Sequence, residues 1–174
     1  MFSDMTMQLQ TQILSLYKTV VRSHVEYRVS AWNLHYMKDK ELIEKVQRRF
    51  TEMINSMEGK TCEERRDCLE LLTLEERRNR HDLIEVFEMC SGLSRLKLNE
   101  FFTLDNNIKG TRGHSWKLVK FRCTGDCCKY LLSNRVINRW NQLDQLQAVG
   151  ASSINAFRGR LSKIRETRMG FFMD

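Results

Sequence analysis

A short basic segment carries the clearest chemical signal in this sequence. The stretch from Thr111 to Arg122 contains several cationic side chains and two aromatic residues, Trp116 and Phe121, and it contains no acidic residue. Such cations can neutralise phosphates, and exposed aromatic rings can stack on bases. The segment therefore predicts nucleic-acid binding, although an extended basic loop can also simply face solvent. Its candidate binding residues are Arg112, His114, Lys117, Lys120 and Arg122.

A second set of candidate phosphate ligands has helical spacing. Lys45, Arg48 and Arg49 would share one face of a helix. Glu41 and Glu44 each precede a cation by four residues, so this face is either a self-neutralising solvated surface or a phosphate contact. Three more candidates are expected on the outer faces of the C-terminal helices, namely Arg135, Arg139 and Arg158.

The last predicted helix is strongly basic. Its cations between Arg158 and Arg168 are accompanied by a single acid, Glu166, so we expect them to be unpaired. The helix could lie on nucleic acid or on an acidic membrane surface, or it could be a soluble terminal helix.

The cysteines suggest a metal site only weakly. Cys123, Cys127 and Cys128 follow His114, but the spacing Cys-x3-Cys-Cys is not the Cys-x2-Cys of zinc knuckles and ribbons. We therefore expect no metal and no cofactor, and we expect the 6 cysteines to be reduced. No cysteine has an assigned base, so nucleophilic catalysis is not expected either.

Hydrophobic residues that recur every three or four positions predict the helices that would carry these groups. A first helix is expected from Leu9 to about Val29. A second should start at Asp39 and carry its apolar face from Leu42 to Met57, and the two together read as a helical hairpin. The stripes expected to be buried are Leu9, Ile13, Leu16 and Val20 in the first helix and Ile43, Val46, Phe50 and Ile54 in the second.

Two capping patterns predict the next helices. Thr61 with Glu64 and Thr73 with Glu76 both match the capping box, in which a hydroxyl and a carboxylate three residues apart satisfy the free amides of a first turn. A short helix should therefore precede a longer one, and the longer one should end at Gly92.

Helical periodicity is lost from 93 to 129 and returns from Tyr130 to Leu143 and again after Ser153. We therefore expect an all-α fold, a helical bundle of about five or six helices with one extended basic insertion. The expected organisation is a bundle over 1–92, an irregular basic and aromatic segment over 93–129, and C-terminal helices over 130–174 that pack on the same core.

Charge and hydropathy restrict the partners. The net charge of +7 permits a polyanionic partner. The sequence lacks the run of about 18 apolar residues that a membrane span requires, and its N-terminus lacks the order of a signal peptide. We therefore expect no membrane partner and a location in the cytoplasm or nucleus.

An ordered series of motifs resembles one protein family. The run LYKTVVRSHVEY from Leu16 to Tyr27, followed by Trp32 and by VQRR at 46–49, is similar to the region after the polymerase palm in reverse transcriptases of non-LTR (LINE-type, jockey-like) retrotransposons. The family pattern has proline where this chain has Ser23. Later family motifs follow in the same order and extend the resemblance to about Ile164: LTLEERR at 72–78, DLIEV at 82–86, TRGH at 111–114 and SNRVINRWN at 133–141.

The resemblance implies a thumb and its C-terminal extension, in which helices press on the template–primer duplex. It makes Lys45, Arg48, Arg49, Arg112 and His114 the matched candidates for phosphate contact. The family's Tyr-x-Asp-Asp or Phe-x-Asp-Asp motif, which holds the catalytic metal ions, is missing, and the chain has no adjacent Asp-Asp pair. We therefore expect a non-catalytic fragment that binds RNA, DNA or an RNA/DNA hybrid without sequence preference.

Two alternatives stay open at this point. The chain could be a helical protein-interaction module, or could self-associate, through apolar positions around Ile13, Tyr17 and Val21 that a palm would otherwise cover. It could also be a translated retroelement fossil without activity.

Overall fold

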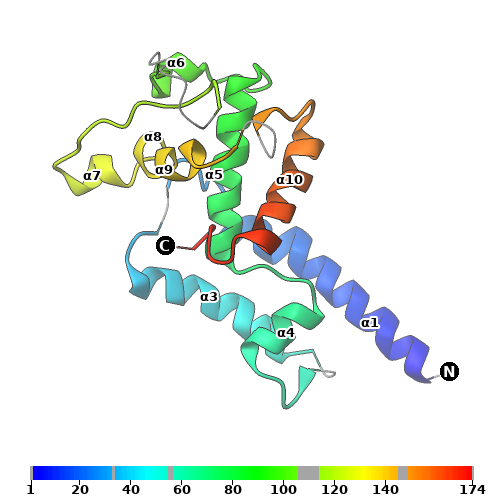
Figure 1. Cartoon of the computed structure of the whole chain (residues 1–174). Coiled ribbons are helices and arrows are strands. Elements are labelled where there is room, and N and C mark those ends of the chain that lie inside the picture. The colour runs from blue at the N-terminus through cyan, green and yellow to red at the C-terminus, as the bar shows by residue number, and fades with distance from the viewer. Residues whose placement is uncertain (1, 33, 55–56, 106–113, 145–148, 174) are drawn as a thin grey trace. The chain divides into compact units, whose positions relative to one another are not determined.

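The computed structural model describes residues 2–32, 34–54, 57–105, 114–144 and 149–173 (Figure 1). Within these residues the regular elements are helices, and the only extended pairing is an isolated antiparallel bridge between Leu104 and Leu118. The predicted all-α class is confirmed. The helices are α1 (Phe2–Leu16), the π-helix η1 (Tyr17–Val21), α2 (Arg22–Val25), α3 (Met37–Glu52), α4 (Cys62–Cys68), α5 (Leu74–Cys90), α6 (Leu98–Phe101), α7 (Asp126–Lys129), α8 (Leu132–Arg135), α9 (Ile137–Asn141) and α10 (Ile154–Thr167).

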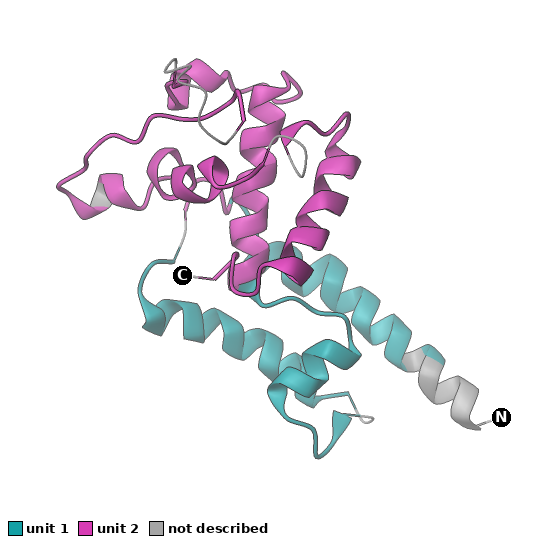
Figure 2. Ribbon diagram, viewed as in Figure 1, with its two compact units in different colours: residues 1–28, 34–74 teal, residues 29–33, 75–174 magenta. Residues whose placement is uncertain are grey.

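The chain divides into two compact units (Figure 2). Unit 1 comprises residues 1–28 and 34–74, and unit 2 comprises residues 29–33 and 75–174. The division therefore differs from the expected boundary at residue 92, because the buried side of α5 packs with α8, α9 and α10 in one hydrophobic cluster. No helix in the described part of the chain is both long enough and apolar enough to cross a bilayer.

The first helix of unit 1 is longer and less regular than expected. It begins at Phe2, changes to a π-helix over Tyr17–Val21 and ends with α2 at Val25, four residues before the expected end. The amide of Arg22 donates to the carbonyl of Tyr17, five residues back, which is the hydrogen bond of a π-turn. Helical structure therefore does continue through Ser23, but a widened turn precedes it.

This helix differs from the predicted stripe at two positions, while Ile13 of the stripe is half-buried and the side chain of Leu9 lies outside the described residues. Tyr17 is buried and its ring stacks on Phe50 of α3, with 4.1 Å between the ring centroids. Leu16 and Val20, which were expected to be buried, are 61% and 53% exposed. The prediction was wrong at these two positions because the buried place is taken by Tyr17, whose hydroxyl donates to a buried partner described below.

The stripe predicted for the second helix is confirmed at Ile54, which is buried, but not at position 46. Gln47 is only 1% exposed, whereas Val46, expected in the core, is 39% exposed. Gln47 can be buried because its polar atoms are satisfied: its Oε1 accepts from the Tyr17 hydroxyl at 2.9 Å, and its Nε2 donates to the Leu72 carbonyl at 3.0 Å. A hydrogen-bonded amide has displaced the valine from the core of unit 1.

The capping box at Thr61 is confirmed. The Thr61 amide donates to Glu64 Oε2 at 2.7 Å, and the Glu64 amide donates to Thr61 Oγ1 at 3.3 Å, so both groups satisfy the first turn of α4. The predicted end of the longer helix is also confirmed, since α5 stops at Cys90 and Gly92 follows with φ of +68°.

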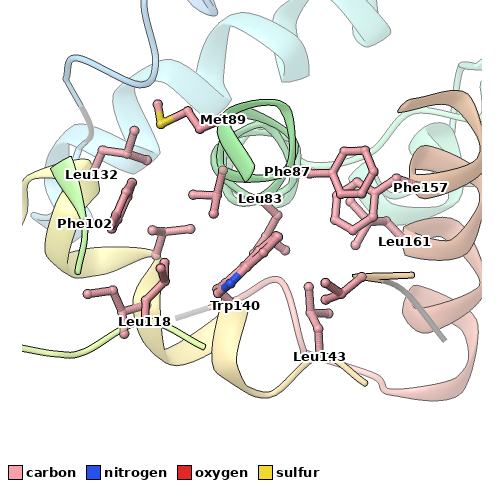
Figure 3. Close-up of a cluster of buried hydrophobic side chains, with 14 of the residues drawn as sticks. Leu83, Phe87, Met89, Phe102, Leu118, Leu132, Trp140, Leu143, Phe157 and Leu161 are labelled. Atoms are coloured by element: carbon pink, nitrogen blue, oxygen red, sulfur yellow. The ribbon is translucent and has the colours of Figure 1, made fainter. Parts of the chain in front are cut away.

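Unit 2 is built around α5 and Trp140 (Figure 3). Trp140 of α9 is fully buried and points toward Leu83 of α5, while Phe157 of α10 stacks on Phe87 with 4.3 Å between the ring centroids. The C-terminal helices thus pack on α5, in a core that also contains Phe102 and Leu118 from the irregular segment.

The irregular segment is tied to α9 through its backbone. Around the bridge, the Asp105 amide donates to the Lys117 carbonyl and the Val119 amide donates to the Thr103 carbonyl, both at 2.8 Å. On the other side of this pairing, the side-chain amide of Asn141 accepts from the Leu118 amide at 2.9 Å and donates to the Leu118 carbonyl at 2.8 Å. The described part of the basic insertion is therefore fixed to unit 2.

Candidate nucleic-acid interface

The candidate interface with the most free charge is the solvent face of α3 in unit 1. Lys45, Arg48 and Arg49 are exposed, and their spacing along the helix places them on one face. Among the residues that the structure describes, no carboxylate lies within ion-pair distance of any of the three. The face is therefore not the self-neutralising surface that the glutamates in its sequence allowed.

The missing neutralisation has a structural cause in α4. Glu44 Oε1 lies 3.4 Å from Arg66 Nη1, and Glu44 Oε2 accepts from the Leu74 amide at 3.0 Å. Glu52 Oε1 lies 3.2 Å from Arg65 Nη2. The predicted pairing of Glu44 with Arg48 is therefore replaced by a pairing with a different helix.

The buried side of α3 holds this face in place. Gln47 joins α3 to Tyr17 and to the backbone at Leu72, and Thr51 accepts from Arg65 Nε at 3.3 Å through its hydroxyl. Arg65 also donates to the Lys60 carbonyl at 2.8 Å. Because these bonds are made on one side of the helix, they fix which side carries Lys45, Arg48 and Arg49.

This arrangement is suited to phosphates. Three cations within about one helical turn can contact adjacent phosphates of a backbone, and each contact releases condensed counterions. The two arginines can also bind a phosphate with two parallel N–H donors.

In the basic segment of unit 2, His114 is not available for phosphate binding as predicted. Arg112 lies outside the described residues. His114 is buried, its Nε2 donates to the Trp140 carbonyl at 2.9 Å, and its ring meets Trp140 edge to face. Desolvation lowers the pKa of His114, which favours the neutral ring. The prediction of His114 as a phosphate ligand is therefore contradicted by its burial.

The remainder of this segment is only partly available. Trp116 packs against the core, and its carbonyl accepts from Trp140 Nε1 at 2.7 Å, so it is not a free stacking surface. Lys117 is half-buried. Lys120 is exposed and donates to Asn138 Oδ1 at 3.0 Å, and Arg122 and Phe121 are exposed at the end of the segment.

Arg135 is a structural residue. Its guanidinium donates to both carboxylate oxygens of Asp82, at 2.7 and 2.8 Å, and also to the carbonyls of Tyr130 and Val29. The Arg135 and Asp82 side chains are 9% and 2% exposed. Burial raises the pKa of Asp82, and the hydrogen bonds from Arg135 act in the opposite direction. Arg135 was expected on an outer face, and that expectation was wrong because sequence alone did not reveal its partner 53 residues away.

The remaining arginines of unit 2 are mostly engaged as well. Arg139 is half-buried and donates to Asn79 Oδ1 at 3.3 Å and to the Met173 carbonyl at 3.4 Å. On α10, Arg158 is exposed, but Arg165 lies 2.6 Å from Glu76 Oε1.

Beyond the end of α10, Arg168 Nη2 lies 3.0 Å from Asp144 Oδ2. The cations of the C-terminal helix and of the residue that follows it are thus less available than their local sequence suggested, because acids from other parts of the chain pair with Arg165 and Arg168.

The structure places no metal site in the described residues, where no group of three or more His, Cys, Asp or Glu side chains is positioned to hold an ion. Cys123 Sγ instead lies 2.6 Å from Asn134 Nδ2. Burial raises the pKa of Cys90 to about 12, so this thiol stays protonated at neutral pH.

Sequence reasoning missed the ion-pair partners of Glu52 and Glu44, which are Arg65 and Arg66 of α4. No local spacing links these arginines to the two glutamates. Comparison of the chain with protein-family models, with curated proteins and with solved structures finds no match.

Proposed function

We propose that this chain binds RNA, DNA or an RNA/DNA hybrid without sequence preference, and that the α3 face of unit 1 makes the principal phosphate contacts. The observation that carries the proposal is the exposure of Lys45, Arg48 and Arg49 without a carboxylate partner among the described residues. Cations that are already paired with acids add little to polyanion binding. In a chain with a net charge of +7, the three unpaired cations of this face therefore contribute more to binding than three paired cations would.

The ordered motifs of the sequence support a more specific origin. We propose that the chain corresponds to the thumb and the following region of a LINE-type reverse transcriptase. Such a fragment holds nucleic acid and does not extend it, because the sequence lacks the paired aspartates that bind the two catalytic metal ions.

Fluorescence anisotropy of a labelled RNA/DNA primer–template at several salt concentrations tests the binding. The triple variant K45A/R48A/R49A should reduce the log–log salt slope by about two to three, since each lost phosphate contact removes about 0.7 to 0.9. A charge-matched control is R95A/K97A/K163A, which removes three exposed cations of unit 2. Equal losses in the two variants would show that only total charge matters and would contradict the proposal.

A protein-interaction role is the second candidate, and a specific observation favours it. Leu16, Val20 and Val21 of the first helix are exposed, the first two by more than half. Of the positions expected to be free, Tyr17 is excluded because it is buried. Sedimentation velocity in high salt tests this candidate: self-association that persists there and is abolished by L16E/V20E would support it, and a monomer under all conditions would not.

A further inference from the structure

We infer that the ion pairs between α3 and α4 control the nucleic-acid affinity of the α3 face, and that Arg66 is a positioning residue which keeps Arg48 available by holding Glu44. This inference rests on the proposed function, because it concerns the same face. It assigns a role to a residue that does not itself need to touch the polyanion.

The geometry of α3 makes this control necessary. Glu44 precedes Arg48 by four residues and Glu52 follows it by four, and residues four apart on a helix can pair. Left to themselves, both acids could therefore neutralise Arg48. In the structure both acids instead form ion pairs with α4: Glu44 pairs with Arg66, and Glu52 pairs with Arg65.

The Glu44 pair is well suited to hold its position. The Glu44 and Arg66 side chains are mostly buried, so their attraction is screened less than that of a surface pair. Glu44 also accepts from the Leu74 amide at the start of α5 and from Gln47 Nε2 at 3.4 Å. These contacts keep the carboxylate on the side of α3 away from Arg48.

Arg66 is the better residue to test. Arg65 bonds to Thr51 and to the Lys60 carbonyl as well as to Glu52, so its loss would disturb the fold of unit 1. The guanidinium of Arg66 bonds to Glu44. Removing it leaves Glu44 Oε1 with only the 3.4 Å hydrogen bond from Gln47 Nε2, so this oxygen can turn to the stronger cationic partner Arg48 and occupy it.

A binding cycle of the parent chain, R66M, E44Q and E44Q/R66M, extended by R48A and R48A/R66M, tests the inference. R66M should weaken primer–template binding about fivefold near 0.1 M salt and lower the salt slope by about 0.7 to 0.9, the loss of one phosphate contact. E44Q alone should change affinity less than twofold, because Glu44 is already held and the amide oxygen that replaces its carboxylate can still accept from the Leu74 amide. E44Q/R66M should bind like the parent chain, and R66M should have no further effect when Arg48 is already replaced by alanine.

R95M is the matched control for the loss of one positive charge, since Arg95 is exposed in unit 2. If R66M binds no more weakly than R95M, or if E44Q fails to restore it, Arg66 does not position Glu44 and the inference is overturned. A merely structural role of Arg66 would also give weak binding, but E44Q would not rescue it.

A second readout separates this inference from the proposed function. The Nε–H resonance of Arg48, followed by nitrogen-15 NMR without nucleic acid, should shift and exchange more slowly in R66M and return in E44Q/R66M. An unchanged resonance overturns the inference whatever the binding result. If the resonance responds but the parent chain binds no primer–template, Arg66 does position Glu44 away from Arg48, and it is the proposed function that fails.

Discussion

Arg48 in unit 1 and Arg135 in unit 2 are alike in sequence and opposite in structure. Each was predicted on the polar face of a helix whose opposite face is apolar. Arg48 is exposed, and the acids nearest to it in sequence pair elsewhere. Arg135 makes four hydrogen bonds, two of them to a buried aspartate. The availability of a cation is therefore decided by where the carboxylates of other helices lie, and not by the charge pattern of its own helix.

The largest expected effect would come from breaking the buried pair. R135M leaves Asp82 as an uncompensated charge in the core of unit 2, and such a loss costs about 3 to 5 kcal/mol of the free energy of unfolding. Urea unfolding followed by tryptophan fluorescence measures it selectively, because Trp32, Trp116 and Trp140 all belong to unit 2.

The matched substitution R48M should change the stability by less than about 0.5 kcal/mol, as is usual for exposed positions. If both variants unfold at the same urea concentration, Arg135 is no more structural than Arg48, and the contrast between the two units disappears.

A smaller effect is expected from the polar core of unit 1. Q47L removes the acceptor of the Tyr17 hydroxyl and the donor to the Leu72 carbonyl, so it should destabilise unit 1 by about 1 to 3 kcal/mol although leucine is more hydrophobic. V46Q, at the exposed neighbouring position, should cost less than about 0.5 kcal/mol. Hydrogen exchange of the α3 amides measures both, and the reverse order of effects would restore the predicted orientation of α3.

The smallest expected effect concerns pH. Burial lowers the pKa of His114 in the folded state, so below the unfolded-state pKa of about 6.5 the unfolded chain takes up a proton that the folded chain does not. The free energy of unfolding should therefore fall as the pH decreases from about 7 toward 5, by at most about 1.4 kcal/mol per pH unit. H114Q should flatten this dependence in urea titrations at pH 7.5 and 5.5; an identical dependence in both proteins would exclude His114 as the cause.

Sequence periodicity and capping predicted the all-α class, the capping box at Thr61 and the stop at Gly92, because these depend on residues a few positions apart. They failed to predict that Val46, Leu16 and Val20 are exposed while Gln47 and Tyr17 are buried. Hydrophobicity alone cannot indicate that Gln47 will be buried, since its burial depends on Tyr17 and Leu72, which are distant in sequence.

The candidate site was predicted unevenly for the same reason. The three cations of α3 were found correctly as exposed helical residues, whereas Arg135 and His114 were expected at the surface and are held inside by Asp82 and Trp140. Local composition identifies which residues could bind phosphate. Contacts between distant segments decide which of them remain available, and a single sequence does not reveal these contacts.

The pairing of Asn141 with Leu118 has a further consequence, for the chain's resistance to aggregation. The extended stretch around Leu118 carries the apolar residues Trp116, Leu118, Val119 and Phe121, and an open edge of such a stretch invites strand addition by another molecule. On one side the stretch is paired through Lys117 and Val119, and on the other the Asn141 amide occupies both backbone groups of Leu118. The Asn141 side chain thereby makes the hydrogen bonds that a neighbouring strand would make with Leu118. It blocks the addition of a strand from another molecule at this position.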